Sequence, residues 1–147
     1  MSFELRFASI EDLAFARELT CRNMLRYYIK HELPWQDHAF DEAWSDRQNW
    51  LVLSENVAVG YLGLSRDMRA IYIRELQVTE AFHRQGAGSW AVDQVVSMAQ
   101  RERRQAIRLT VFEDNPARNL YERKGLQVQG KDMCFLRMQL DISTHVL

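Results

Sequence analysis

The sequence has little proline or glycine and no low-complexity stretch. Two prolines and 6 glycines occur among 147 residues, and no linker-like run separates one part of the chain from another. A chain of this length normally forms one domain and buries roughly two thirds of the surface that its unfolded form exposes. We therefore expect a single domain over residues 1–147.

Cysteine and histidine are also sparse, and neither occurs in a metal-binding pattern. Cys21 and Cys134 are far apart and form no C-x-x-C motif, which favours two reduced thiols. The histidines match neither H-E-x-x-H nor a Cys/His zinc spacing; they are His31, His38, His83 and His145. The sequence argues against a structural or catalytic metal.

Long hydrophobic runs and an excess of charge of either sign are absent as well. No apolar stretch is long enough for a transmembrane helix, and the N-terminal residues lack the pattern of a signal peptide. We expect a cytoplasmic protein without a membrane partner. Lys and Arg total 19 against 20 Asp and Glu, a net charge of −1. Nucleic-acid binding depends on many phosphate contacts, so this balance disfavours nucleic acid as the main partner.

The chain does contain a regular succession of strand and helix patterns. Apolar and polar residues alternate where strands are expected, and recur at helical spacing elsewhere. Strands are predicted over residues 4–8, 50–53, 57–64, 69–78, 106–112, 126–128 and 133–140. Helices are predicted over residues 10–30, 37–46, 86–104 and from Asn115, a capping residue, to Gly125, a left-handed stop. This order predicts an α/β fold with helices packed on a central sheet.

The segment RELQVTEAFHRQGAGSWAV, residues 74–92, has the character of a phosphate-binding loop. Glycines let backbone N–H groups approach a ligand closely, and a helix N-terminus favours an anion. Gly86-x-Gly88-x-x-Ala91 also fits the dinucleotide fingerprint, but the residues Thr79–Gln85 separate it from the preceding strand. A nucleoside triphosphate P-loop is disfavoured as well, because no Walker A lysine follows. A glycine pair that only lets the helix pack on the sheet is the remaining alternative.

A second segment, residues 114–126, reads DNPARNLYERKGL. Together the two segments resemble the GNAT superfamily of N-acetyltransferases, whose pyrophosphate loop has the form Gln/Arg-x-x-Gly-x-Gly/Ala. The later helix of that family reads Asn-Pro-Ala-Arg-x-Leu-Tyr-Glu-Arg-x-Gly-Phe. The motifs occur in the expected order, and the resemblance is strongest from Tyr72 to Gly130. His83 and Leu126 depart from the pattern, where the family usually has Gln or Arg and Phe, respectively.

The resemblance implies both a fold and an activity. The implied fold is a mixed, mostly antiparallel central sheet of about seven strands flanked by about four helices. The implied activity is transfer of an acetyl group from acetyl-CoA to a primary amine by direct attack, without a metal. The expected partner is a small-molecule amine, and a homodimer is compatible with the sequence. A protein lysine or N-terminal acetyltransferase is an alternative, as is a non-catalytic domain that senses acyl-CoA.

Residues for cofactor binding and acid catalysis follow from the resemblance. Tyr121 occupies the family's position for the general acid, which protonates the departing thiolate; a tyrosine that only packs the helix is the alternative. The implied contacts with acetyl-CoA come from the strand end, the loop and the last helix: Leu76, Gln77, Val78, His83, Arg84, Gln85, Gly86, Ala87, Gly88, Ser89, Asn115, Ala117, Arg118, Tyr121 and Arg123. A helix cap is the alternative role for Asn115, and a solvated face for each arginine.

The base and the acceptor pocket are predicted from local pattern. An alkylamine has a pKa of about 10.4, so a base must remove its proton before it can attack. Glu75 is the candidate base because strand alternation places it on one face with Ile73 and Gln77; Tyr72 and Glu32 are alternatives. Among the aromatic residues of the first two helices, Tyr27, Tyr28 and Trp35 are predicted to bind the substrate, with a core role as the alternative.

Overall fold

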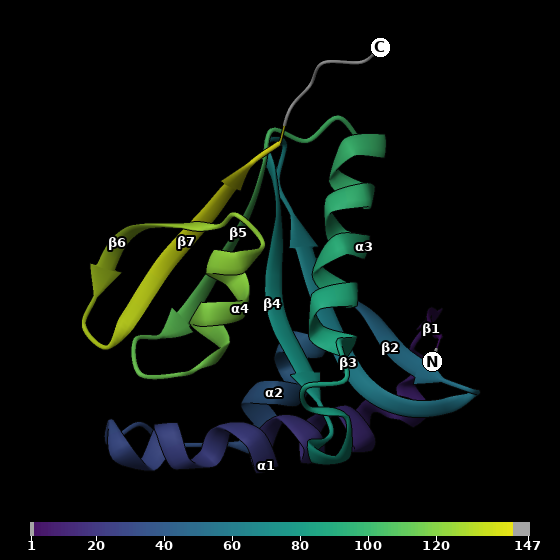
Figure 1. Ribbon diagram of the computed structural model, residues 1–147. Coiled ribbons are helices and arrows are strands. Elements are labelled where there is room, and N and C mark those ends of the chain that lie inside the picture. Colours follow the sequence, from purple (N-terminus) through teal and green to yellow (C-terminus); the bar gives the residue numbers. More distant parts are fainter. Residues whose placement is uncertain (1, 143–147) are drawn as a thin grey trace. The chain divides into compact units, whose positions relative to one another are not determined.

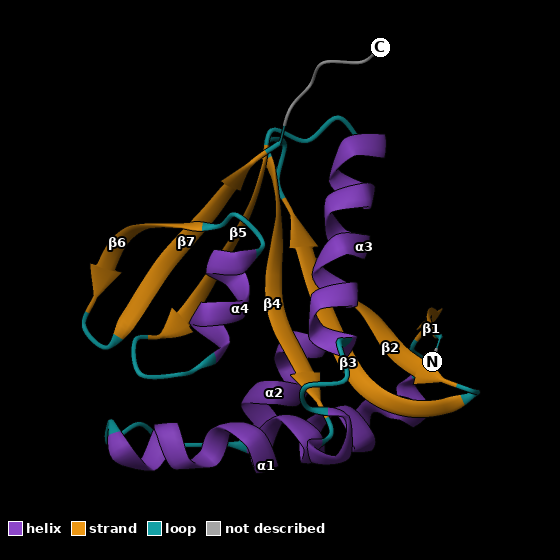
Figure 2. Ribbon diagram, in the orientation of Figure 1, coloured by secondary structure: helices purple, strands orange, loops and turns teal. Residues whose placement is uncertain are grey.

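Seven strands form one sheet in the computed structural model, which describes residues 2–142 and therefore not His145. Hydrogen bonding connects them in the order β1-β2-β3-β4-β5-β7-β6 (Figures 1 and 2). The β4–β5 pair is parallel, whereas β1–β2, β2–β3, β5–β7 and β6–β7 are antiparallel. The predicted mixed α/β fold with a mostly antiparallel sheet is confirmed.

The elements follow the predicted order along the chain. The strands are β1 (Phe3–Phe7), β2 (Gln48–Ser54), β3 (Val57–Arg66), β4 (Ala70–Val78), β5 (Ala106–Phe112), β6 (Gln127–Asp132) and β7 (Phe135–Asp141). The α-helices are α1 (Leu13–Lys30), α2 (Asp37–Trp44), α3 (Ala87–Arg101) and α4 (Ala117–Arg123). Two short 3-10 helices, η1 (Ile10–Asp12) and η2 (Glu80–Phe82), precede α1 and α3.

Backbone conformation explains where the helices end. The predicted helix over residues 86–104 stops at Arg101, and Arg103 lies in the left-handed region with φ +58°. Gly125 follows α4 with φ +96°, which confirms the predicted glycine stop. The Asn115 side-chain oxygen accepts a hydrogen bond from the Ala117 N–H at 2.9 Å, so Asn115 caps α4 as predicted.

Contacts group the described chain into two compact units. The first contains residues 2–64 and 75–88, and the second contains residues 65–74 and 89–142. In the first unit, α1 contacts α2, and both helices pack on β3 through a buried cluster of Ala16, Leu19, Phe40, Trp44 and Tyr61. Trp44 stacks on Tyr61 with ring centroids 5.6 Å apart.

The second unit has its own buried layer. The inward residues of β5 and β7 include Ile107, Leu109, Leu136 and Met138, all at most 6% exposed. Helix α4 contacts β5, and α3 buries a stripe of Ala91, Val92, Val95 and Ala99. The prediction of a single domain over the whole chain stays a prediction.

The sequence predicts neither a metal site nor a transmembrane helix, and the structure bears on both for residues 2–142. Across residues 2–142, no three His, Cys, Asp or Glu side chains are grouped closely enough to hold a metal ion. None of the helices in that range is long and apolar enough to cross a membrane.

Candidate functional site

The glycine loop lies between the end of β4 and the start of α3. Arg84 and Gly86 both have left-handed backbone, with φ +67° and +85°. Arg84, Gln85 and Gly86 are exposed, and a Cβ placed on Gly86 would meet nothing within 4 Å. The first N–H groups of a helix have no intrahelical partner and attract anions. The open loop at this helix start therefore fits a phosphate-bearing ligand.

His83 anchors the loop to β4. Its Nε2 lies 2.7 Å from the Val78 carbonyl oxygen, and because a carbonyl only accepts, Nε2 must carry the proton. The same carbonyl accepts a hydrogen bond from the Asn23 Nδ2 of α1 at 3.1 Å. His83 departs from the family pattern, and the structure gives it this anchoring contact.

Glu75 lies in a hydrogen-bonded network on the first unit. Its Oε1 accepts from Gln77 Nε2 at 3.0 Å, and Gln77 Oε1 accepts from Asn23 Nδ2 at 3.1 Å. The Glu75 side chain is 20% exposed. Burial raises the pKa of the Glu75 carboxyl above its usual value, and the opposing effects of Gln77 and Arg47 do not cancel that increase. A carboxylate in such a place can exchange a proton closer to neutral pH than an exposed one.

Arg47 faces this carboxylate from the segment between α2 and β2. Its Nη1 lies 3.9 Å from Glu75 Oε2, is buried, and has no hydrogen-bond partner among residues 2–142. A buried guanidinium N–H without an acceptor is costly, so the position suits an acceptor atom supplied by a ligand or a water.

Tyr61 and Tyr28 complete the surroundings of Arg47 and Glu75. The Tyr61 hydroxyl donates to Asn49 Oδ1 at 2.6 Å, and burial raises the pKa of Tyr61 to about 12, so the phenol stays neutral. Burial, followed by the charge of Glu75, raises the pKa of Tyr28. The buried phenol of Tyr61, the half-buried phenol of Tyr28, a guanidinium and a carboxylate thus lie together in the first unit.

The predicted substrate residues lie in different surroundings. Tyr28 contacts Trp35 edge to face, with ring centroids 5.3 Å apart, and Trp35 also packs against the core cluster. The Trp35 indole donates to Asp37 at 2.8 Å. Tyr27 is 7% exposed, and its hydroxyl accepts from Arg26 at 3.2 Å. The structure joins Tyr28 with Trp35, and places Tyr28 within the electrostatic influence of Glu75.

The second unit holds the residues predicted on α4. Tyr121 is 6% exposed. Its backbone carbonyl oxygen accepts a hydrogen bond from the Leu126 N–H at 3.0 Å, just beyond the end of α4. Arg118 pairs with Glu122 at 3.0 Å, one turn along the helix, whereas Arg123 is exposed. Asn115 serves as the helix cap, and contact of these residues with acetyl-CoA stays a prediction.

The hydrogen-bonded register of β4 with β5 ends at Ile73 and Leu109. β4 continues to Val78 and β5 to Phe112, so the ends of both strands extend past this ladder. Leu76–Val78 therefore lie beyond the hydrogen-bonded ladder with β5. Within that stretch the Val78 carbonyl already accepts from Asn23 and His83.

Sequence reasoning missed Arg47 and did not assign a role to Asn23. Both contact β4 residues across long sequence separations, and Asn23 and Gln77 are 54 positions apart. Arg47 stands between a predicted helix and a predicted strand, where an arginine normally indicates only a solvated loop. No spacing pattern could have connected it to Glu75.

Comparison with known families finds one that spans most of the chain. The model of the acetyltransferase (GNAT) family matches residues 10–126. The match covers both units and includes the glycine loop, Glu75 and Tyr121.

Solved structures share the same fold at low sequence identity. The ribosomal-protein-S18-alanine N-acetyltransferase from Escherichia coli aligns with a TM-score of 0.78 and 17% identity, over 99% of this chain and 97% of its own. The PaiA N-acetyltransferase from Thermoplasma acidophilum, in complex with coenzyme A, aligns with a TM-score of 0.77 and 17% identity, over 96% of this chain and 99% of its own. A GNAT acetyltransferase from Elizabethkingia anophelis, with acetyl-CoA bound, aligns with a TM-score of 0.76 and 12% identity, over 95% of this chain and 97% of its own.

Proposed function

Because the chain belongs to the acetyltransferase (GNAT) family, we propose that this acetyl-CoA-dependent N-acetyltransferase acts on a small primary amine by direct attack. The observation that carries the proposal is the environment of Glu75. Its carboxylate is mostly buried, is oriented by Gln77, and has a raised pKa. Such a group suits the removal of a proton from an ammonium ion.

The glycine loop is the proposed site for the pyrophosphate of acetyl-CoA. Residues 83–89 provide an exposed turn, the open space at Gly86 and the N-terminus of α3. His83 holds the first part of this loop on Val78. The backbone of Leu76–Val78 is proposed to contact the pantetheine arm, and Asn115, Ala117, Arg118 and Arg123 the remainder of the cosubstrate.

Proton transfers are assigned to two side chains. Bound acetyl-CoA supplies the thioester, whose carbon–sulfur bond breaks as the carbon–nitrogen bond forms. Glu75, directly or through a water, takes the proton that the ammonium loses. Tyr121 gives a proton to the thiolate sulfur and recovers it from solvent. The phenol is a suitable donor because its ordinary pKa of about 10 lies not far above that of a thiol.

Tyr28, Trp35 and Arg47 are the proposed acceptor-side contacts. The aromatic pair offers an apolar surface, and Arg47 Nη1 offers a buried N–H donor beside the Glu75 carboxylate. Tyr27 stays a weaker candidate because it is buried and bonded to Arg26.

The proposal is tested by measuring thiol release from acetyl-CoA with a panel of acceptors. The panel contains small amines, amino acids, and short peptides with either a free N-terminus or a single lysine, because the E. coli structure above is a protein N-acetyltransferase. We expect turnover with a small amine that exceeds turnover with the peptides. Faster turnover of a peptide would replace the small-amine proposal with protein acetylation, and binding without turnover of any acceptor would contradict the proposed roles.

A further inference from the structure

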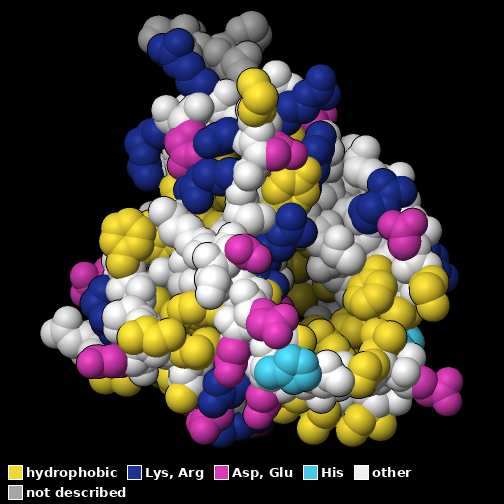
Figure 3. Space-filling model, turned by 180° about the vertical axis from the view of Figure 1, so that it is seen from behind, with side chains coloured by type: hydrophobic (Ala, Val, Ile, Leu, Met, Phe, Trp, Pro, Cys, Tyr) yellow, Lys and Arg dark blue, Asp and Glu magenta, His cyan; other side chains and the backbone are white. Residues whose placement is uncertain are grey.

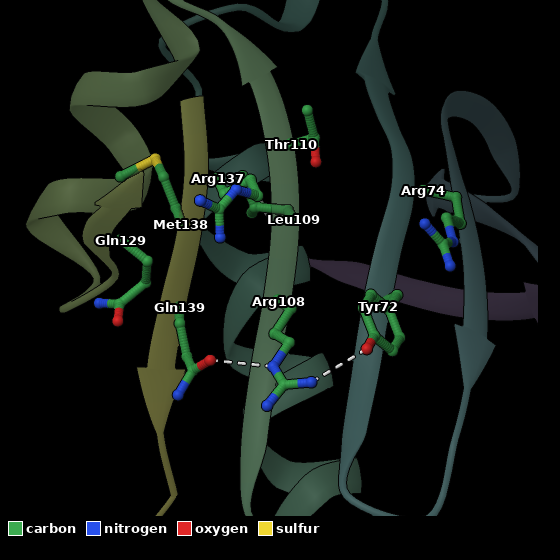
Figure 4. A pocket seen from close by; sticks show the side chains of 9 residues that line it. All are labelled: Tyr72, Arg74, Arg108, Leu109, Thr110, Gln129, Arg137, Met138 and Gln139. Atoms are coloured by element: carbon green, nitrogen blue, oxygen red, sulfur yellow. Dashed lines mark hydrogen bonds between the residues drawn. The ribbon is translucent and has the colours of Figure 1, made fainter. Parts of the chain in front are cut away.

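A pocket of about 490 Å³ lies on the polar face of the second unit. Nine residues from β4, β5, β6 and β7 line it: Tyr72, Arg74, Arg108, Leu109, Thr110, Gln129, Arg137, Met138 and Gln139 (Figure 4). None of these described lining residues is acidic, whereas three are arginines. From behind, Figure 3 shows Lys and Arg side chains gathered in the upper part of the surface.

Strand register brings the lining residues together. Tyr72 is paired with Arg108, and Arg108 with Gln139, so these three side chains form one row across β4, β5 and β7. Arg137 is paired with Thr110, two residues from the Arg108–Gln139 pair on each strand. Residues two apart on a strand share a face, so Arg74, Thr110 and Arg137 stand beside that row.

Two side-chain hydrogen bonds hold Arg108 at the centre of the pocket. Its Nε donates to Gln139 Oε1 at 2.9 Å, and its Nη1 donates to the Tyr72 hydroxyl at 3.0 Å (Figure 4). The Tyr72 hydroxyl in turn donates to Asp67 at 2.8 Å. Both hydrogen-bond acceptors of Arg108 are neutral. No carboxylate in residues 2–142 forms a direct ion pair with Arg108, although its charge contributes to lowering the pKa of Asp67, behind Tyr72. A half-buried guanidinium with N–H donors to spare is prepared for an anion.

The other two arginines flank this centre. The Arg74 guanidinium lies over the Tyr72 ring at 4.5 Å, and its Nε donates to Ser65 at 2.8 Å. Arg137 donates through Nε to Asp132 at 2.7 Å, so its charge is partly neutralised. A Cβ on Gly130 would overlap the Arg137 guanidinium, so a side chain at position 130 would displace that guanidinium from its present place.

We propose that this pocket binds an oxyanion, a carboxylate or phosphate group of a small ligand. Arg108 is the central contact, through charge-assisted hydrogen bonds, and Arg74 and Arg137 add charge from either side. Residues 83–88 of the glycine loop belong to the other unit, and no residue of the loop lines the pocket. The inference goes beyond the proposed acetyl transfer and does not depend on it.

The test uses inorganic phosphate and malonate as separate probes, with the full chain and backbone 1H–15N NMR. We expect either probe to shift the amide signals of residues around Arg108 and Gln139. Arg108→Gln and Arg74→Gln should each weaken binding, by about tenfold or more for Arg108→Gln, since one charged hydrogen bond contributes about 1.5–3 kcal/mol. Arg101→Gln removes an exposed arginine at the end of α3 and should leave the affinity unchanged.

The outcomes separate the possible results. A preference for malonate identifies a carboxylate ligand, and a preference for phosphate identifies a phosphate ligand. Shifts confined to residues 84–89, or no shift at millimolar probe, would overturn the proposal. Equal affinity in wild type and in both Arg74→Gln and Arg108→Gln would overturn it as well. Arg74 is exposed, so Arg74→Gln keeps the test valid even where Arg108→Gln lowers stability.

Discussion

At the scale of single residues, the chemistry depends on how far the protein shifts the pKa values of ionisable side chains from their ordinary values. Glu75 has a raised pKa because burial removes water from its carboxylate, although Arg47 lies 3.9 Å away. Tyr61, with its pKa raised to about 12, stays neutral at neutral pH. Of these two side chains, Glu75 is therefore the one whose pKa burial moves from the acidic range towards neutral pH.

Replacing Glu75 by Gln should lower kcat at neutral pH and alter the pH profile. The wild-type rate should rise with pH along an acidic limb that lies above the ordinary Glu pKa of about 4.3, because only the carboxylate accepts a proton. In Glu75→Gln this limb should disappear, and high pH should partly restore the rate, because more of the amine is then neutral. An unchanged profile would show that Glu75 is structural and that Tyr72 or Glu32 deserves the same test.

The same substitution makes a separate prediction for stability. A carboxyl whose pKa is higher in the folded state stabilises the fold fully below its unfolded pKa, and this contribution is lost as pH rises through the folded pKa. Glu75→Gln cannot ionise, so its melting temperature relative to wild type should rise as the pH is raised from the ordinary Glu pKa of about 4.3 through the higher folded-state pKa. Thermal unfolding measured by circular dichroism across this range tests the sign; a falling difference would contradict the raised pKa.

Replacing Tyr121 by Phe should lower kcat far more than it changes affinity for acetyl-CoA. The ring still fills its buried position on α4, so the fold is kept, but the proton donor is lost. General acid catalysis typically contributes about 10²–10⁴-fold to the rate. Steady-state kinetics together with calorimetric binding of acetyl-CoA tests this. A wild-type rate would leave Tyr121 as a packing residue only.

At the scale of elements, the glycine loop depends on backbone conformation more than on side chains. Gly86 needs a left-handed backbone, which Asn and Asp tolerate better than other residues with a Cβ. The position also has room for a side chain, because nothing lies within 4 Å of a Cβ placed there. Asn and Asp have nearly the same shape and differ by one charge, so they form a matched pair.

Gly86→Asp should weaken acetyl-CoA binding strongly, and Gly86→Asn should weaken it much less. The added carboxylate would repel the pyrophosphate at the start of α3, whereas the amide only occupies space. We expect a difference between the two variants of about tenfold or more, since like charges a few ångströms apart cost about 1–4 kcal/mol. Calorimetry measures both affinities. Equal affinities of the two variants would show that the pyrophosphate does not bind at this loop.

At the scale of the whole molecule, binding and stability are linked. A ligand that binds only the folded state stabilises it by RT ln(1 + [L]/Kd), about 2.7 kcal/mol at 100 times Kd. Saturating acetyl-CoA should therefore raise the melting temperature of this 147-residue chain by several degrees. The melting temperature of Gly86→Asp should rise much less at the same acetyl-CoA concentration. A wild-type melting temperature that does not change when acetyl-CoA is added would contradict binding to the folded protein.

The sequence by itself determined the order of elements, the family and the location of the loop and cap. Strand alternation, helical spacing, the Asn115 cap and the Gly125 stop depend on residues a few positions apart, so they can be read locally. The boundaries differ from the structure only by a few residues, as at Arg103, where a left-handed backbone ends the helix early.

Only the tertiary structure decided which side chains meet. Asn23 reaches Gln77 across 54 positions, Arg47 faces Glu75, and Arg108 bonds Gln139 across 31 positions. These contacts depend on strand register and on how helices pack, and a register shift of a single residue would turn the side chains of the shifted strand to the opposite face. Burial, which raises the Glu75 pKa, has the same origin, because water is excluded by residues from several distant segments together.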